Sequence, residues 1–159
     1  MPAGGQPVPG AGLLPTTGVS WSPNDHVLVY ELGGPGGALR AVDLGTGREW
    51  TLLRVHLETL SGFTRSPDGR VLAFSDVGTG TNVGPLSKIE LINADGSGLR
   101  TLDPQARRPG WVQAHVPGQT DPLWSPSGRA IGYTRVSGPT NGTRPFQTNV
   151  WLADLSAPA

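Results

Sequence analysis

The chain has 159 residues, no cysteine, and a formal net charge of zero from 12 basic and 12 acidic residues. This length fits one ordinary domain or three to four repeats, and without cysteine there is neither a disulfide framework nor a thiolate metal site. The balanced charge offers no electrostatic footprint for nucleic acid or an anionic surface, so we predict no nucleic-acid partner. No apolar run approaches the length of a transmembrane helix, so we predict no membrane insertion.

Glycine and proline dominate the composition, with 24 and 16 residues, about a quarter of the chain. They fall between short apolar runs, where turns are needed, and almost no window of ten residues lacks one of them. Because both residues disfavour helix, the composition predicts an all-β protein with many turns.

Residues 1–17 are rich in proline and glycine and are predicted to form a flexible lead-in. This stretch has no positively charged start and no apolar run longer than two leucines. We therefore do not predict a secretory signal within it.

The first repeat is predicted over residues 18–53, as four short antiparallel strands joined by turns. Its strands are expected at 18–21, 26–32, 38–44 and 48–53. Residues 54–61 are expected to connect it to a second repeat.

The second repeat is predicted over 62–103 with the same order of strands. They are expected at 62–65, 70–76, 88–93 and 99–103. A long glycine-containing loop, residues 77–87, separates its second and third strands.

An insertion loop is predicted at 104–120, before an incomplete third repeat over 121–159. The third repeat has strands at 121–124, 129–135 and 149–155, and no fourth strand. Within the insertion, a tryptophan lies among basic side chains, a composition typical of recognition loops. These candidate binding residues are Arg107, Arg108, Trp111 and His115. The alternative is that Trp111 packs against the edge of a repeat.

The repeats share a tight turn in which proline presets φ, a small polar residue bonds its own backbone and glycine accepts a positive φ. The turn residues and the tryptophans before them are Trp21, Ser22, Pro23, Ser66, Pro67, Asp68, Gly69, Asp95, Gly96, Trp124, Ser125, Pro126 and Gly128. Ser22 and Ser66 are 44 residues apart, whereas Ser66 and Ser125 are 59 apart because the insertion intervenes.

Four strands in about 44 residues are typical of a β-propeller blade. The strands are near-continuous apolar runs, such as residues 71–74, as expected for strands buried on both faces between neighbouring blades. Trp21 and Trp124 occupy the same repeat position and are predicted to fill the gaps between blades; Arg65 takes that place in the second repeat. We predict a partial propeller of three four-stranded antiparallel blades, the third lacking its outer strand.

Two segments carry a resemblance to a known family. Trp124-Ser-Pro-Ser-Gly-Arg129 followed by an apolar strand, and Asn93-Ala-Asp-Gly-Ser-Gly-Leu-Arg-Thr-Leu102, resemble the TolB-type propeller repeat. The resemblance covers about residues 18–155 and is loosest in the first repeat, where Asn24-Asp25-His26 replaces Asp-Gly-Arg. It implies a propeller and leans towards a periplasmic or extracellular location, although no signal is visible. The compartment stays open.

Candidate catalytic groups have simpler structural interpretations. The three turn serines precede proline and recur by repeat, which favours turn capping over nucleophilic catalysis, and no Gly-x-Ser-x-Gly elbow is present. His26, His56 and His115 lie about thirty or more residues apart without a local metal-binding pattern. Residues 78–84 lack the spacing and the following helix of a phosphate loop. We predict no catalytic residue, no metal and no cofactor.

The predicted function is non-catalytic: binding of a protein or peptide through the loops or the central funnel. An alternative that the resemblance implies is a part of a carbohydrate-active or peptidase-associated propeller enzyme. Another is a truncated fragment of a longer propeller protein, because family propellers close with six or more blades. A further hypothesis is a homodimer that completes a six-blade ring, with residues 12–16 supplying the missing outer strand to the partner.

Overall fold

The computed structural model describes residues 18–32, 37–54, 59–78, 86–102, 118–137 and 147–156. All regular elements within these ranges are strands, and none is a helix that could span a membrane. The strands are β1 (Val19–Trp21), β2 (Val27–Leu32), β3 (Ala38–Asp43), β4 (Glu49–Arg54), β5 (Thr59–Arg65), β6 (Val71–Gly78), β7 (Leu86–Asn93), β8 (Arg100–Thr101), β9 (Gln119–Trp124), β10 (Ala130–Ser137) and β11 (Gln147–Asp154).

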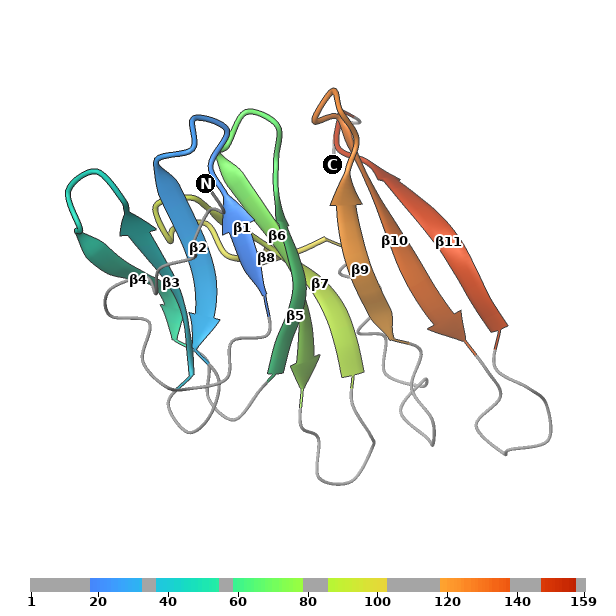
Figure 1. Ribbon diagram of the computed structural model, residues 1–159. Coiled ribbons are helices and arrows are strands. Elements are labelled where there is room, and N and C mark those ends of the chain that lie inside the picture. The colour runs from blue at the N-terminus through green and yellow to red at the C-terminus, as the bar shows by residue number, and fades with distance from the viewer. Residues whose placement is uncertain are drawn as a thin grey trace, which may run out of the picture.

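The strands form three antiparallel sheets, which we call blades 1, 2 and 3. Blade 1 has the order β1-β2-β3-β4, blade 2 the order β5-β6-β7-β8, and blade 3 the order β9-β10-β11. The blades stand side by side (Figure 1), and their first strands are neighbours because β5 contacts both β1 and β9. This arrangement confirms the predicted fold class, with a third blade of three strands among the described residues.

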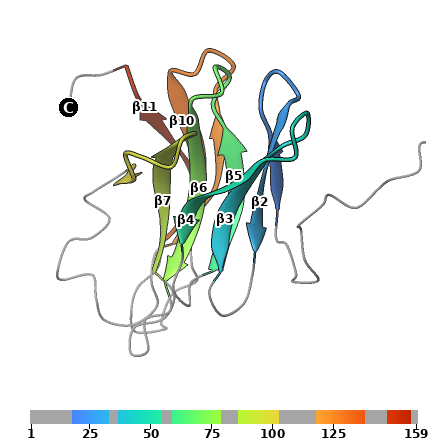
Figure 2. The same cartoon turned by 90° about the vertical axis from the view of Figure 1, so that its left-hand side faces the viewer.

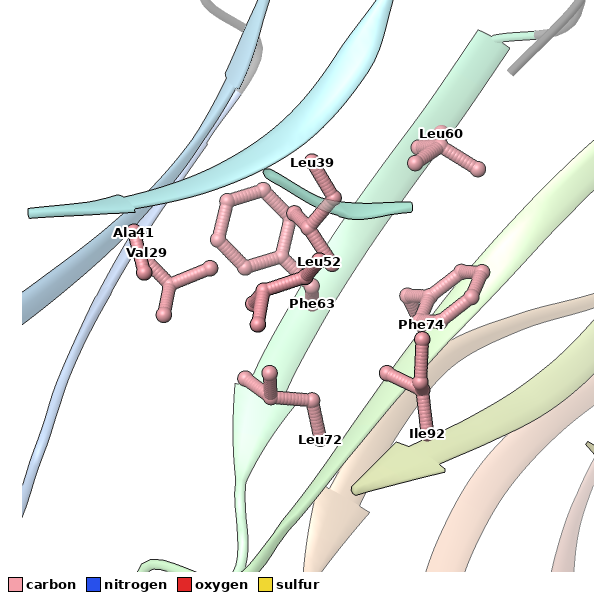
Figure 3. Packing of buried hydrophobic residues seen from close by; sticks show 9 residues of the cluster. All are labelled: Val29, Leu39, Ala41, Leu52, Leu60, Phe63, Leu72, Phe74 and Ile92. Atoms are coloured by element: carbon pink, nitrogen blue, oxygen red, sulfur yellow. The ribbon is translucent and has the colours of Figure 1, made fainter. Parts of the chain in front are cut away.

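One hydrophobic core fills the space between blades 1 and 2 (Figure 3). It arises because alternate residues of a strand point to opposite sides of the sheet, so one side of each blade faces its neighbour. Blade 1 contributes Val29, Leu39, Ala41 and Leu52, and blade 2 contributes Leu60, Phe63, Leu72, Phe74 and Ile92.

A second core lies between blades 2 and 3 and uses the other side of the same blade 2 strands. Its buried members are Ala73, Ile89, Leu91, Ile131 and Tyr133. β6 and β7 are thus covered on both sides, which explains why their sequences are almost continuously apolar. The predicted burial of strands on both faces is therefore confirmed in blade 2.

Two strands begin earlier than their sequences indicate. β5 begins at Thr59, within the expected 54–61 connection, because Gly62 adopts a φ of 57° and the pairing with β6 shifts between Ser61 and Thr64. β9 begins at Gln119, within the expected 104–120 insertion, with a matching pairing shift opposite Asp121, whose φ is 56°. In each case a β-bulge lies inside the strand, so the strand begins before the residue at which it was expected to start.

Two other predictions need correction. β8 spans only Arg100–Thr101, instead of 99–103, because Gly98 still has the positive φ of the preceding turn.

Trp21 was predicted to fill a gap between blades, but its side chain lies on the side of blade 1 away from blade 2 and it is 50% exposed. Trp124 does pack against the core between blades 2 and 3. The repeat position faces the preceding blade, and the described residues hold no blade before blade 1.

Candidate binding rim

The two ends of the blades differ in the lengths of their connections. At one end, which we call the turn end, short segments join the strands: residues 22–26, 44–48, 66–70, 94–99 and 125–129. At the other end, the rim, the connections 33–37 and 55–58 are equally short, whereas 79–85, 102–118 and 138–146 are longer. Figure 1 shows the turn end at the top and the strand ends of the rim at the bottom. The rim is therefore the candidate site for recognition, since long loops on a rigid frame commonly carry function.

The three turn serines make the same backbone hydrogen bond at the turn end. The Oγ of Ser22 accepts from the Val27 amide at 2.8 Å, and those of Ser66 and Ser125 accept from the amides of Val71 and Ala130 at 3.0 Å. Each hydroxyl thereby satisfies the amide that opens the second strand of its blade. These hydrogen bonds make each serine a structural cap of the strand that follows its turn.

A second side chain completes each cap. The Ser22 hydroxyl donates to Asn24 Oδ1 and the Ser66 hydroxyl to Asp68 Oδ1, both at 2.6 Å. In blade 3 the Oγ atoms of Ser125 and Ser127 lie 3.2 Å apart. Hydrogen bonds from the Ser66 hydroxyl and the Arg70 amide hold the pKa of Asp68 below its ordinary value.

Neighbouring turns stack against one another along the turn end. A Cβ built on Gly69 would lie 2.7 Å from Pro23 Cδ of blade 1, and one on Gly128 would lie 3.6 Å from Pro67 Cδ of blade 2. The proline of each turn thus sits beside the glycine of the next. Figure 2 shows the three turns together at the upper end.

Asp95 and Gly96 form the turn between β7 and β8. Oδ1 of Asp95 accepts hydrogen bonds from the amide and hydroxyl of Ser97, which hold the pKa of Asp95 below its ordinary value. Gly96 has a φ of 91°, and a Cβ there would lie 2.8 Å from the Leu52 carbonyl oxygen. Its glycine is required by both the backbone angle and the approach of β4.

The structure describes the end of the insertion but not the candidate binding residues themselves. Arg107, Arg108, Trp111 and His115 lie outside the described residues. The insertion rejoins the fold at Gln119, which is buried. Oε1 of Gln119 accepts from the Ile89 amide at 3.2 Å, and its backbone oxygen accepts from the Ser87 hydroxyl. The insertion is therefore anchored to β7 at the rim.

A charged cluster lies on the rim half of blade 2, on the side facing blade 1. Lys88 is 2.9 Å from Asp76 Oδ2 and also pairs with Glu90, which accepts from the Thr101 hydroxyl at 3.2 Å. Burial by itself would lower the pKa of Lys88, but hydrogen bonds to Glu90 and Asp76 outweigh it and raise that pKa. No group of three or more His, Cys, Asp or Glu arranged for a metal ion occurs in the described part of the chain.

Glu31 places a carboxylate inside the interface between blades 1 and 2. It is 2% exposed, and its Oε1 accepts from the Leu60 amide at 3.2 Å. Its Oε2 has no hydrogen-bond partner among the described residues. Burial raises the pKa of Glu31, and the hydrogen bond from Leu60 opposes part of that rise.

A partly exposed cation–π pair on blade 3 was not predicted from the sequence. The guanidinium of Arg135 lies 4.6 Å from the ring centroid of Trp151, a cation–π contact on the side facing blade 2. Trp151 remains partly exposed. The available signal was the alternation of residues 131–135 and 149–153, which places Arg135 and Trp151 on one face once the register is known.

Of the three histidines, the described residues include one, His26. His26 is exposed and its carbonyl accepts from the Leu44 amide at 2.8 Å, at the turn end. His56 and His115 lie outside the described ranges, as do residues 79–85 of the glycine-containing loop.

No protein-family model matches the sequence, and no curated protein matches it at a significant level. Solved structures do match. The putative TolB of Agrobacterium tumefaciens is 25% identical, with a TM-score of 0.61 over 89% of this chain and 46% of that chain. The chain has a TolB-like propeller fold.

Two further structures show the breadth of this likeness. TolB of Acinetobacter baumannii is 15% identical, with a TM-score of 0.60 over 89% of this chain and 30% of that one. An oligogalacturonate lyase in complex with manganese is 20% identical, with a TM-score of 0.60 over 87% of this chain and 39% of that one. This chain therefore spans less than half the length of each of these three chains, and both enzymes and other proteins share its fold.

Proposed function

We propose that the chain is a non-catalytic TolB-like propeller module that binds a protein or peptide at the rim. The observation that carries this proposal is that the three longest connections, 79–85, 102–118 and 138–146, all lie at the rim. The turn end is built from short turns fixed by serine caps, while the segment joining blades 2 and 3 at the rim runs from 102 to 118. Rigid blades that hold long loops at one end suit recognition.

The chemistry of the rim favours a peptide that combines carboxylates with apolar side chains. The insertion carries Arg107, Arg108 and Trp111, and blade 3 adds Arg135 stacked on the partly exposed Trp151. Guanidinium groups bind carboxylates through paired hydrogen bonds, and tryptophan supplies a large apolar contact.

A peptide array tests this proposal. Acidic–aromatic peptides and charge-reversed basic versions would be screened against the full chain, and the affinity of the strongest binder measured by fluorescence anisotropy. We expect acidic peptides to bind, and the triple variant Arg107→Ala/Arg108→Ala/Trp111→Ala to weaken binding at least about tenfold.

The matched control removes two arginines from the turn end, in Arg70→Ala/Arg129→Ala. This variant is expected to keep the wild-type affinity. Equal loss in both variants would indicate general charge attraction rather than a site, and an absence of binders would refute the peptide-binding proposal.

A second candidate is an enzyme, which the likeness to the oligogalacturonate lyase supports. Incubation of the full chain with oligogalacturonate and Mn²⁺ tests it directly. The formation of an unsaturated sugar product at a rate proportional to the protein concentration would establish this candidate in place of the binding module.

A further inference from the structure

Blade 3 presents an apolar face away from blade 2. We call Leu123, Val150 and Leu152 the open face of blade 3; Gly132 pairs with both leucines, which places them on one side of the sheet. Val150 is 86% exposed and Leu152 is 73% exposed. Thr134 and Thr148, which flank Val150 on this side, are uncharged. An apolar sheet face of this kind is uncommon in a lone domain.

The repeat identifies what this face normally meets. Gly132 and Ala73 each stand seven residues after their turn serine, and their partners across the sheet are Leu152 and Leu91. Leu91 is only 1% exposed because blade 3 covers it. The open face of blade 3 is therefore built as a contact surface between blades, with the covering blade missing from the described residues.

Blade 1 presents the complementary side. Val19 and Trp21, which we call the open face of blade 1, lie on the side away from blade 2 and are 58% and 50% exposed. Trp21 occupies the position of Trp124, which packs on the preceding blade. Leu28, Tyr30 and Val42 lie on the same side and are already buried, so the exposed contact surface of this side is limited to β1.

Neither face carries an unbalanced charge that would oppose contact. On the blade 1 side, Arg40 and Glu49 form an ion pair of 2.8 Å and neutralise each other. The blade 3 side offers leucine, valine and threonine, and the charged group that shares this side, Asp154, lies at the turn end near Arg129. Apolar surfaces of matching character pack without the cost of burying an unpaired charge.

We propose that the open face of blade 3 binds the open face of blade 1 in a second copy of this chain. With two copies related by a twofold axis, each blade 3 packs on the blade 1 of its partner, and both exposed faces are covered at once. Two sets of three blades give six, within the range of 4–8 found in closed propellers. The expected product is a ring-shaped homodimer.

Two substitutions on different blades test this geometry. Multi-angle light scattering at micromolar concentration is expected to give 33.2 kDa for the wild-type chain, twice the 16.6 kDa of one copy. Val150→Glu and Trp21→Lys are each expected to give 16.6 kDa, because each damages both interfaces of the ring. Leu99→Glu, an equally drastic change on an exposed turn residue outside both faces, is expected to remain dimeric.

Mixing the two variants provides the decisive result. A mixed dimer has one interface of wild-type composition, while the other places the introduced lysine against the introduced glutamate. We expect the mixture to recover the 33.2 kDa species. Circular dichroism and urea unfolding of each variant would show that the blades remain folded.

Several outcomes would overturn the proposal. A monomeric wild-type chain would mean that a blade other than one from a second copy covers these faces. A dimer lost in Val150→Glu but kept in Trp21→Lys, without recovery on mixing, would indicate contact between two blade 3 faces. A series of masses above the dimer would mean that the head-to-tail contact does not close.

Discussion

Trp124 owes its burial to blade 2. It packs against the core that joins Leu91 and Ile131, and it shares its repeat position with the half-exposed Trp21. Its Nε1 is buried without a hydrogen-bond partner among the described residues, so the energy it contributes comes from apolar contact.

Replacing Trp124 by alanine should therefore reduce the free energy of unfolding by about 3 kcal/mol, near the lower end for such substitutions because the side chain is only partly buried. Urea unfolding in the Val150→Glu background, which is expected to be monomeric, would measure this loss. Trp124→Phe should cost less, because it keeps apolar volume and removes the unpaired Nε1. Trp21→Ala should cost under about 1 kcal/mol in the same monomer. Similar losses in both alanine variants would contradict the assigned burial.

Glu31 makes stability depend on pH in an unusual direction. Its carboxyl has a raised pKa in the folded chain because of burial, so the folded state binds its proton more tightly than the unfolded state. The contribution of this group to stability is greatest below the ordinary pKa of 4.5 and declines as the pH rises through the raised folded value. At neutral pH the charged form opposes folding.

Glu31→Gln should thus stabilise the chain at pH 7 by about 1 kcal/mol, the low end of the cost of an unsatisfied buried charged group. The gain should disappear below about pH 4, where both side chains are uncharged. Asp95→Asn is the opposite control: its lowered pKa means that its stabilising effect is present at neutral pH and lost in acid. Parallel urea melts across this range would separate the two courses, and a gain for Glu31→Gln that does not vary with pH would reject the titration.

At the scale of elements, the turns of adjacent blades stack so that the proline of one turn lies beside the glycine of the next. Gly69 has a φ of 75°, and its added Cβ would approach Pro23 to 2.7 Å. Gly47 has a similar φ of 71° but no atom within 4 Å of such a Cβ. The two glycines share the backbone requirement and differ only in the neighbouring blade.

This difference predicts unequal effects of one substitution. Gly47→Ala should cost about 1 kcal/mol from the left-handed backbone alone, and Gly69→Ala about 2–3 kcal/mol because the clash with Pro23 adds to it. Adding Pro23→Ala should recover part of the loss at Gly69 and none at Gly47. A double-mutant cycle on unfolding free energies measures this coupling, and zero coupling would mean that the turns do not stack.

At the scale of the whole molecule, the two open faces link stability to assembly. If two copies close a ring, the dimer stabilises the folded state by mass action, and the melting temperature should rise with protein concentration. We expect an increase of about 1–3 °C for each tenfold increase in concentration. The melting temperature of Val150→Glu should not change with concentration. Calorimetry at three concentrations would check both, and a constant wild-type value would contradict ring closure.

Local features could be predicted from the sequence because they depend on residues close together in the chain. The Ser66-Pro67-Asp68-Gly69 turn and the apolar strand after it indicated a hairpin, and their spacing indicated blades. The bulges at Gly62 and Asp121 were not predicted, because a positive φ inside a strand leaves no periodic signal in the sequence. The starts of β5 and β9 were therefore predicted too late in the chain. The Arg135–Trp151 pair was not predicted because it depends on the register between β10 and β11.

The sequence by itself determined the repeating unit, since turn chemistry and strand periodicity act over a few residues. Only the tertiary structure decided which side of each blade meets a neighbour. That contact partly buries Trp124 and leaves Trp21 half exposed at the same repeat position, encloses Glu31, and requires glycine at 69. The physical reason is that burial and close approach belong to pairs of blades, and a pair of blades brings together residues far apart in the chain.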